Sequence, residues 1–181
     1  MNYSNTWLIE KYNTGERLKF LFFWGHQPSK DATVTKSCFS QWWLSPFTVD
    51  GILYPSAEHW MMAEKARLFG DDEALQRVLV AKTPAEAKKI GRLVKNFEPA
   101  LWDENKYQSV VEGNLHKFSQ HADLLAFLLN TGDRVLVEAS PVDKIWGIGM
   151  AGDHKDVENP TRWKGENLLG YALMETRDKL Q

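Results

Sequence analysis

The sequence has little of what defines several common protein classes. Cys38 is the only cysteine, which excludes an internal disulfide and a cysteine metal cluster. No apolar run approaches the roughly 20 residues that span a bilayer, and residues 1–7 lack the features of a signal peptide. The formal net charge of −2 argues against a polyelectrolyte partner bound by bulk charge, although a local basic pocket could hold one phosphate. We therefore expect one domain over residues 1–181, in the reducing cytoplasm and without a membrane partner.

The frequent cofactor and catalytic motifs are missing as well. The chain contains no P-loop and no HExxH, GxSxG or dinucleotide GxGxxG motif. Its five histidines show no metal-ligand spacing. The sequence therefore predicts neither a metal site nor a cofactor.

The pattern of apolar and polar residues predicts mostly helices, with a few short strands. Strands are expected at 18–24, in a hairpin over 47–54 that turns at Asp50-Gly51, and at 134–138. Helices are expected at 57–69, 72–80, 84–94, 103–120, 122–130 and 167–180. Because strands and helices do not alternate regularly, the predicted class is α+β, a single mostly helical domain.

A few residues set the expected bounds of these elements. Ser56 is an N-cap for the first long helix, and Thr83 to Glu86 form a capping box with Pro84 at the first helical position. Pro99 is expected to break the chain before Trp102, and Asn167 is expected to cap the last helix. The strand at 18–24 is expected to be buried. The polar segments 26–38 and 150–164 are predicted loops that border a binding site.

The most informative ionisable residue is Glu58, which lies in the first turn of the helix that follows Ser56. An acid at this position is favoured by the helix dipole alone, so its presence has a purely structural explanation. Lys65 is seven residues further on and therefore shares its helix face, about 10 Å along the axis. One face could thus offer a reactive carboxylate and a cation for an anionic group.

Other features with chemical potential follow the expected strand at 134–138. Glu138 and Asp143 bracket a turn that precedes Trp146 and Gly147, and residues after strand ends often carry function. The structural alternative is an ordinary turn rich in turn-forming residues. The chain also has 8 tryptophans, which either fill the core or stack on a planar base.

These stretches, taken in order, resemble the NADAR superfamily of YbiA-like N-glycosidases. The matching segments are SPFTVDGILYPSAEHWMMAEKA at 45–66, KTPAEAKKIGR at 82–92, Trp102, HKFSQHADLLAFLLNTGDRVLVEASPVDKIWGIG at 116–149 and GENLLGYALMETR at 165–177. Met62 departs from the glutamine of many relatives, and Phe39-Ser40-Gln41 replaces an FSN-type loop.

The resemblance implies hydrolysis of a ribosyl–nitrogen bond, most simply in the ribosylamino-pyrimidine phosphates of riboflavin biosynthesis. It places the catalytic residues on Glu58, Trp102 and Asp143. We predict that Glu58 acts at the sugar carbon and that Asp143 positions the ribose hydroxyls or the base. Substrate-binding residues are expected at Lys65 and Arg92 for a phosphate, and at Trp146, Gly147, Gly149 and Asn167.

Three alternatives stay open at this stage. The first is an ADP-ribosyl-guanine hydrolase acting on nucleic acid, for which the two long loops supply Lys30, Lys36, Lys155, Arg162 and Lys164 among several acids. The second is a non-catalytic module that binds NAD or ADP-ribose and does not need Glu58. The third is a purely structural helical domain. The expected partner is therefore a small ribosylated base or ADP-ribose derivative, with ADP-ribosylated nucleic acid as the alternative.

Overall fold

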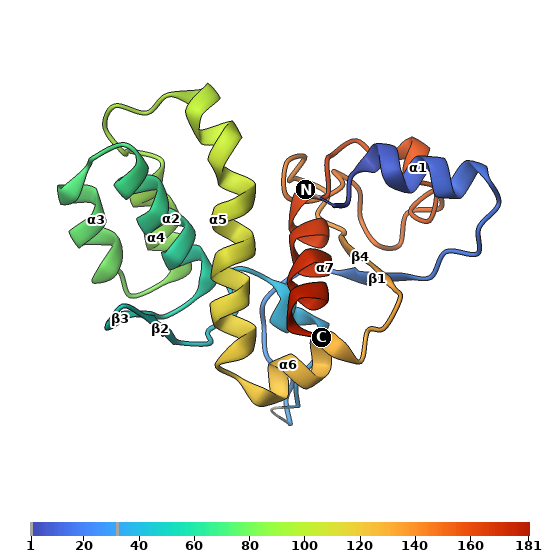
Figure 1. Cartoon of the computed structure of the whole chain (residues 1–181), viewed down its shortest axis with the longest axis horizontal. Coiled ribbons are helices and arrows are strands. Elements are labelled where there is room, and N and C mark those ends of the chain that lie inside the picture. Colours follow the sequence, from blue (N-terminus) through green and yellow to red (C-terminus); the bar gives the residue numbers. More distant parts are fainter. Residues whose placement is uncertain (1, 32) are drawn as a thin grey trace. The chain divides into compact units, whose positions relative to one another are not determined.

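The computed structural model describes residues 2–31 and 33–181 and confirms a mostly helical α+β fold with few short strands. The chain forms two compact units (Figure 1). Unit 1 comprises residues 1–40 and 123–181, and unit 2 comprises residues 41–122. The prediction that the chain acts as a single domain stays a prediction.

Unit 2 is built around one buried helix, α2 (Ala57–Leu68). Three other helices pack against it: α3 (Asp72–Leu79), α4 (Pro84–Gly91) and α5 (Pro99–Ser119) (Figure 1). Two glycines permit close approach to α2, because a Cβ on Gly91 would lie 2.0 Å from the Met62 sulfur and one on Gly113 would lie 2.4 Å from the Trp60 ring. These contacts hold α2 from two sides.

The hairpin that precedes α2 has the predicted form. Strands β2 (Phe47–Val49) and β3 (Ile52–Tyr54) pair antiparallel. Asp50 and Gly51 at the turn have φ of 50° and 78°, as a tight hairpin turn with two left-handed residues requires. The Phe47 and Tyr54 rings stack 5.8 Å apart, and both side chains belong to the core of unit 2.

Unit 1 contains the second small sheet. Strands β1 (Phe20–Phe23) and β4 (Val135–Glu138) pair in parallel, and helix α7 (Leu168–Leu180) packs against β4. The remaining elements are α1 (Asn5–Asn13), η1 (Lys36–Phe39), α6 (Ala122–Leu129) and η2 (Pro160–Arg162). None of the helices in residues 2–31 and 33–181 is long and apolar enough to cross a membrane.

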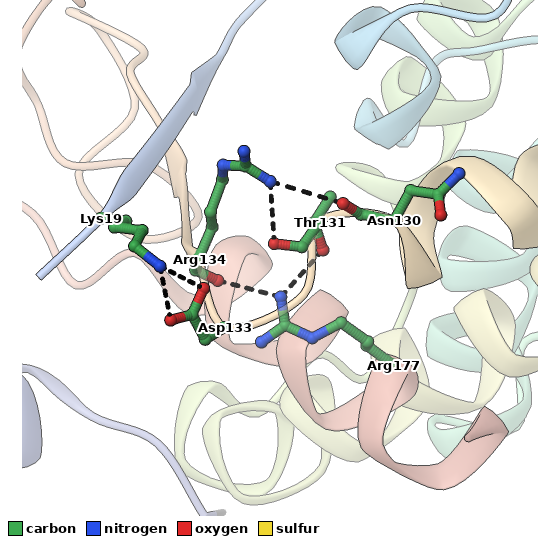
Figure 2. Close-up of polar contacts among 6 residues, drawn as sticks. All are labelled: Lys19, Asn130, Thr131, Asp133, Arg134 and Arg177. Atoms are coloured by element: carbon green, nitrogen blue, oxygen red, sulfur yellow. Dashed lines mark hydrogen bonds and ion pairs between the residues drawn. The ribbon is translucent and has the colours of Figure 1, made fainter.

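A buried arginine ties α7 to the turn before β4 (Figure 2). The Arg177 guanidinium, 3% exposed, donates to Thr131 Oγ1 and to the Arg134 carbonyl, both at 2.9 Å. Burial lowers the pKa of Arg177, and its bonds go to neutral oxygens. Outside this contact, Lys19 and Asp133 form a solvent-exposed ion pair at 3.0 Å. The buried bonds position β4 and therefore the loop that follows it.

Several expected boundaries were wrong. Pro99 does not break the chain: it is the first residue of α5, where its missing N–H costs nothing, and Trp102 lies in the first helical turn. Helix α4 ends at Gly91, three residues early. Helix α1 was not predicted, although Ser4 caps it through a 3.1 Å bond from the Trp7 amide.

The strand at 18–24 was predicted to be buried, and only Phe23 in it is buried. Residues Phe20 to Phe22 are partly exposed, and Trp24 is 59% exposed. The reason is that β1 has a strand neighbour on one side only among the described residues. An apolar run therefore did not distinguish an edge strand from a central one.

Candidate active site

Glu58 lies in the first turn of α2, as predicted. The Ser56 side chain caps the helix, and the Glu58 N–H donates to the Gln41 carbonyl at 2.9 Å. The Glu58 side chain is 2% exposed. The carboxyl group therefore lies at the positive end of the helix dipole.

A buried histidine fixes this end of α2. His59 Nε2 contacts the Ala81 carbonyl at 3.2 Å and must donate to it, so the Ser56 hydroxyl donates to Nδ1 of the neutral ring at 2.7 Å. Burial lowers the pKa of His59, which favours this neutral form. The residue adjacent to Glu58 is thus locked by two hydrogen bonds.

Gln41 beside Glu58 was not predicted to be functional, although it ends the Phe39-Ser40-Gln41 segment that stands where relatives have an FSN-type loop. Its side chain is 7% exposed, and Nε2 donates to Asn114 Oδ1 at 3.3 Å. Its Oε1 is buried and accepts no hydrogen bond from the described part of the chain. An unsatisfied buried acceptor costs about 1–3 kcal/mol, so a ligand that donates a hydrogen bond to Gln41 would recover this energy.

Lys65 and Trp102 are brought together in unit 2. The Lys65 Nζ lies 4.0 Å from the centroid of the Phe97 ring and 5.6 Å from that of Trp102. Burial lowers the pKa of Lys65, and it makes no ion pair with any described residue. Two rings hold this cation without neutralising it, which leaves it available to an anion.

The structure places Arg92 at the end of α4. Its backbone caps that helix, and its side chain is exposed and makes no hydrogen bond or ion pair with the described residues. The preceding Gly91 lies directly against Met62, which is four residues after Glu58 and three before Lys65. The backbone of Arg92 therefore lies near the middle of the segment of α2 that carries Glu58 and Lys65.

In unit 1, Asp143 organises the turn after β4. Its Oδ1 accepts hydrogen bonds from the amides of Ile145 at 2.9 Å and Trp146 at 2.8 Å, while Ser140 Oγ accepts from the Asp143 amide at 3.1 Å. The carboxylate therefore already has a structural role. A catalytic role for Asp143 stays a prediction.

Gly147 and Gly149 follow in the same turn and are required by the backbone. A Cβ on Gly147 would lie 2.8 Å from the Glu138 carbonyl oxygen, and Gly149 has a φ of 62°. The Ile148 amide between them donates to that same carbonyl at 3.0 Å. Both glycines hold the turn tightly on the end of β4; their contact with substrate stays a prediction.

Asn167 does not cap α7 with its side chain, contrary to the predicted structural role. Its side chain is fully buried: Oδ1 accepts from the Glu138 amide and Nδ2 donates to the Leu136 carbonyl, both at 3.0 Å. Asn167 has a φ of 55° and joins α7 to β4. Its predicted binding of substrate stays a prediction.

No group of three or more His, Cys, Asp or Glu side chains could hold a metal ion within residues 2–31 and 33–181. What those residues do offer is a buried carboxylate, an unmatched cation, aromatic rings and a buried acceptor. Residues 22–181 match the NADAR domain family.

The chain belongs to the NADAR family.

Family members that are named as enzymes align with most of this chain. It is 41% identical to N-glycosidase R617 of Acanthamoeba polyphaga mimivirus over 168 residues, 90% of this chain and 97% of the relative. N-glycosidase YbiA of Escherichia coli is 36% identical over 80% of this chain and 79% of its own. These relatives confirm the predicted class, an N-glycosidase of the NADAR family.

The NADAR fold of this chain is also found in a solved structure. The NMR structure of E. coli YbiA matches with a TM-score of 0.71 and 30% identity, covering 90% of this chain and 84% of that one. The predicted family and the YbiA-like fold are therefore confirmed. The roles of the individual site residues stay predictions.

Proposed function

We propose that this NADAR protein hydrolyses the C1′–N bond of a phosphorylated ribosylamino-pyrimidine, the class formed early in riboflavin biosynthesis. The single observation that carries the proposal is Lys65, an unmatched cation held by two rings on the same helix as the buried Glu58. Seven residues separate them by about 10 Å along the helix axis. The side chains of Glu58 and Lys65 are flexible, so both can contact one ribose phosphate, with Glu58 at C1′ and Lys65 at the phosphate.

Glu58 is proposed to act at the sugar carbon. When the C1′–N bond breaks, its electron pair leaves with the base nitrogen and positive charge develops on the ribose. A carboxylate beside C1′ stabilises that charge or accepts a proton from the attacking water, whose oxygen forms the new bond to C1′. The base nitrogen takes up a proton, so the products are the free base and ribose phosphate.

Gln41 supports the recognition of a base or sugar with hydrogen-bond donors. The backbone carbonyl of Gln41 accepts a hydrogen bond from the Glu58 amide, and the side-chain Oε1 of the same residue is unsatisfied. A ligand that reaches Glu58 therefore passes close to this acceptor. Amino groups on a pyrimidine and the hydroxyls of ribose are donors of this kind. We propose that Trp102 supplies an aromatic wall beside this ligand. Asp143, Trp146, Arg92 and Asn167 keep their predicted roles as proposals.

A second candidate is hydrolysis of ADP-ribosyl-guanine in nucleic acid. One observation favours it: Lys30, Lys36, Lys155, Arg162 and Lys164 are exposed and make no ion pair with any described residue. Four acids in the same loops weaken it, namely Asp31, Asp153, Asp156 and Glu158. The chemistry at Glu58 would be the same, so the two candidates differ in the substrate alone.

The test is incubation of the protein with a ribosylamino-pyrimidine phosphate and, in parallel, with oligonucleotides that carry ADP-ribosylated guanine, followed by mass spectrometry. Release of free pyrimidine with no release of ADP-ribose is the expected result. Turnover of the oligonucleotide alone would establish the second candidate instead. Binding of either compound without turnover would contradict both and favour a non-catalytic module.

A further inference from the structure

Strand β1 has one edge paired in the sheet. The Val135 amide donates to the Lys19 carbonyl at 2.8 Å, and the Ala139 amide donates to the Phe23 carbonyl at 2.9 Å. Successive residues of a strand direct their backbone groups to opposite sides. The backbone groups of Lys19, Leu21 and Phe23 therefore face β4.

The other edge of β1 is open. The backbone groups of Phe20, Phe22 and Trp24 point away from β4: their N–H groups donate to no described residue, and their C=O groups accept from none. Over the described ranges, β4 is the only strand that pairs with β1 (Figure 1). Such a row of backbone donors and acceptors is a template for one more strand.

The same alternate residues form an aromatic stripe on one face of β1. The Phe20 and Phe22 rings stack with centroids 5.6 Å apart, and Trp163 meets Phe20 edge-on at 6.2 Å. Trp24 continues the stripe and is 59% exposed. Exposed ring faces attract cations as well as apolar groups.

Two pockets lie along the strand and share Phe20. The first, of ≈ 400 Å³, is lined by Tyr12 and Phe20 together with three acids, Glu16, Asp156 and Glu158. The second, of ≈ 500 Å³, touches every residue from Phe20 to Trp24 and therefore follows the strand; Lys36 and Asp153 border it.

The charged groups in and around these pockets carry a small negative excess. Glu16 is engaged by Lys11 at 2.7 Å, whereas Asp153, Asp156 and Glu158 form no ion pair with the described residues. Against four carboxylates stand three lysines, namely Lys36, Lys155 and the Lys11 that pairs with Glu16. A cationic ligand fits this balance, and a nucleic acid does not.

We propose that the open edge of β1 binds an extended basic segment of a partner protein, which adds to the sheet as a strand. Backbone hydrogen bonds to Phe20 and Phe22 supply affinity for any extended chain, and alternate side chains supply specificity. Alternate residues of a strand recur about every 6.6 Å. Arginine or lysine at that spacing reaches the carboxylates of both pockets while its stem lies on the aromatic stripe.

The first experiment uses short synthetic peptides and the full chain. A fluorescein-labelled peptide alternating arginine with threonine is titrated at low salt, beside a matched peptide alternating glutamate with threonine. A third peptide is the arginine peptide with alternate backbone amides methylated on the edge that pairs. We expect saturable binding of the arginine peptide, loss with added salt, no binding of the glutamate peptide and at least tenfold weaker binding of the methylated one.

Hydrogen exchange locates the binding. The amides of Phe20 and Phe22 are expected to exchange more slowly when the arginine peptide is bound, while those of Leu21 and Phe23, already bonded to β4, change little. A double variant, Asp156→Lys with Glu158→Lys, is expected to weaken binding roughly tenfold or more. The double variant Asp72→Lys with Glu104→Lys, at two exposed acids of unit 2, is the charge-matched control and is expected to bind normally.

Three results would overturn the proposal. One is no binding of the arginine peptide, and another is equal binding of the arginine and glutamate peptides. The third is slowing of the Phe20 and Phe22 amides with rising protein concentration and no peptide, together with a doubled mass in solution. That outcome would assign the edge to a second copy of the chain.

Discussion

The ammonium nitrogen of Lys65 lies 5.6 Å from the centroid of the Trp102 ring. Because Phe97 lies on the same cation at 4.0 Å and no described carboxylate pairs with it, the charge is held in place and left uncompensated. This arrangement is what a phosphate-binding lysine needs, and it yields a test that separates binding from catalysis.

Lys65→Met keeps a long side chain against the two rings and removes the charge. For a phosphorylated ribosylamino-pyrimidine we expect KM to rise roughly 10- to 100-fold, the effect of losing a charged hydrogen bond, with a smaller change in kcat. The same substrate without its phosphate should show no difference between variant and parent. Lys89→Met, an exposed lysine on α4, is the control. Equal losses on both substrates would show that Lys65 does not contact the phosphate.

At Asp143, two substitutions distinguish the effect of the carboxylate's charge from that of its hydrogen bonds to the turn. Asparagine at this position keeps an oxygen that can accept the Ile145 and Trp146 amides, whereas alanine removes it. Because the charge is proposed to serve the reaction, we expect Asp143→Asn to fold and to lose activity by about 10²-fold or more. Asp143→Ala should in addition lose stability. Full activity in the folded asparagine variant would limit Asp143 to holding the turn.

Asn167 joins α7 to β4, so substituting it should lower the stability of the fold. Asn167→Gly removes both hydrogen bonds but suits the positive φ, and we expect it to lower the free energy of unfolding by about 1–3 kcal/mol. Asn167→Ala should cost about 1 kcal/mol more, since alanine disfavours this conformation. Urea unfolding measures both. Stability unchanged in the glycine variant would show that the two bonds contribute nothing.

His59 predicts a dependence of stability on pH. Its pKa is lowered by burial in the folded chain, whereas the unfolded chain has an ordinary histidine pKa near 6.5. As pH falls below about 6.5, the unfolded state takes up a proton that the folded state resists, so the free energy of unfolding decreases. The decrease levels off below the folded pKa. Urea unfolding at pH 7.5 and pH 5.5 measures it.

The matched variant for this test is His59→Gln. It lacks the titrating group, so its free energy of unfolding, although lower at pH 7.5, should fall less between the two pH values than that of the parent. Equal decreases in parent and variant would assign the acid sensitivity to other groups.

Local signals in the sequence predicted the elements whose stability is local. The Asp50-Gly51 turn and the Ser56 cap appear in the structure as expected, because a left-handed turn and an unsatisfied helix N-terminus each demand particular residues nearby. Pro99 shows the limit of such signals. Proline ends one helix and begins another equally well, and only the packing of α5 decides between the two.

The parts of the candidate site that depend on tertiary contacts could not be read in the same way. Asn167 precedes a helix, so its position is typical of a helix cap. Its side-chain amide instead forms hydrogen bonds with the backbone of β4, about 30 residues away in the chain. Gln41 has no periodic or capping pattern, and its place in the Phe39-Ser40-Gln41 segment indicated only a departure from the family's FSN-type loop. Its importance comes from burial beside Glu58, which a sequence without structure does not reveal.

The most direct test of the central claim is single-turnover hydrolysis by Glu58→Gln. The substitution keeps the size of a side chain that is 2% exposed and removes its charge. Glu64→Gln on the same helix, whose carboxylate pairs with Arg67, is the control for loss of one acid. Circular dichroism and thermal unfolding establish that both variants are folded. We predict that Glu58→Gln releases free base about 10²- to 10⁴-fold more slowly than the parent, while Glu64→Gln retains its rate. A folded Glu58→Gln protein with the parent's rate would contradict the assignment.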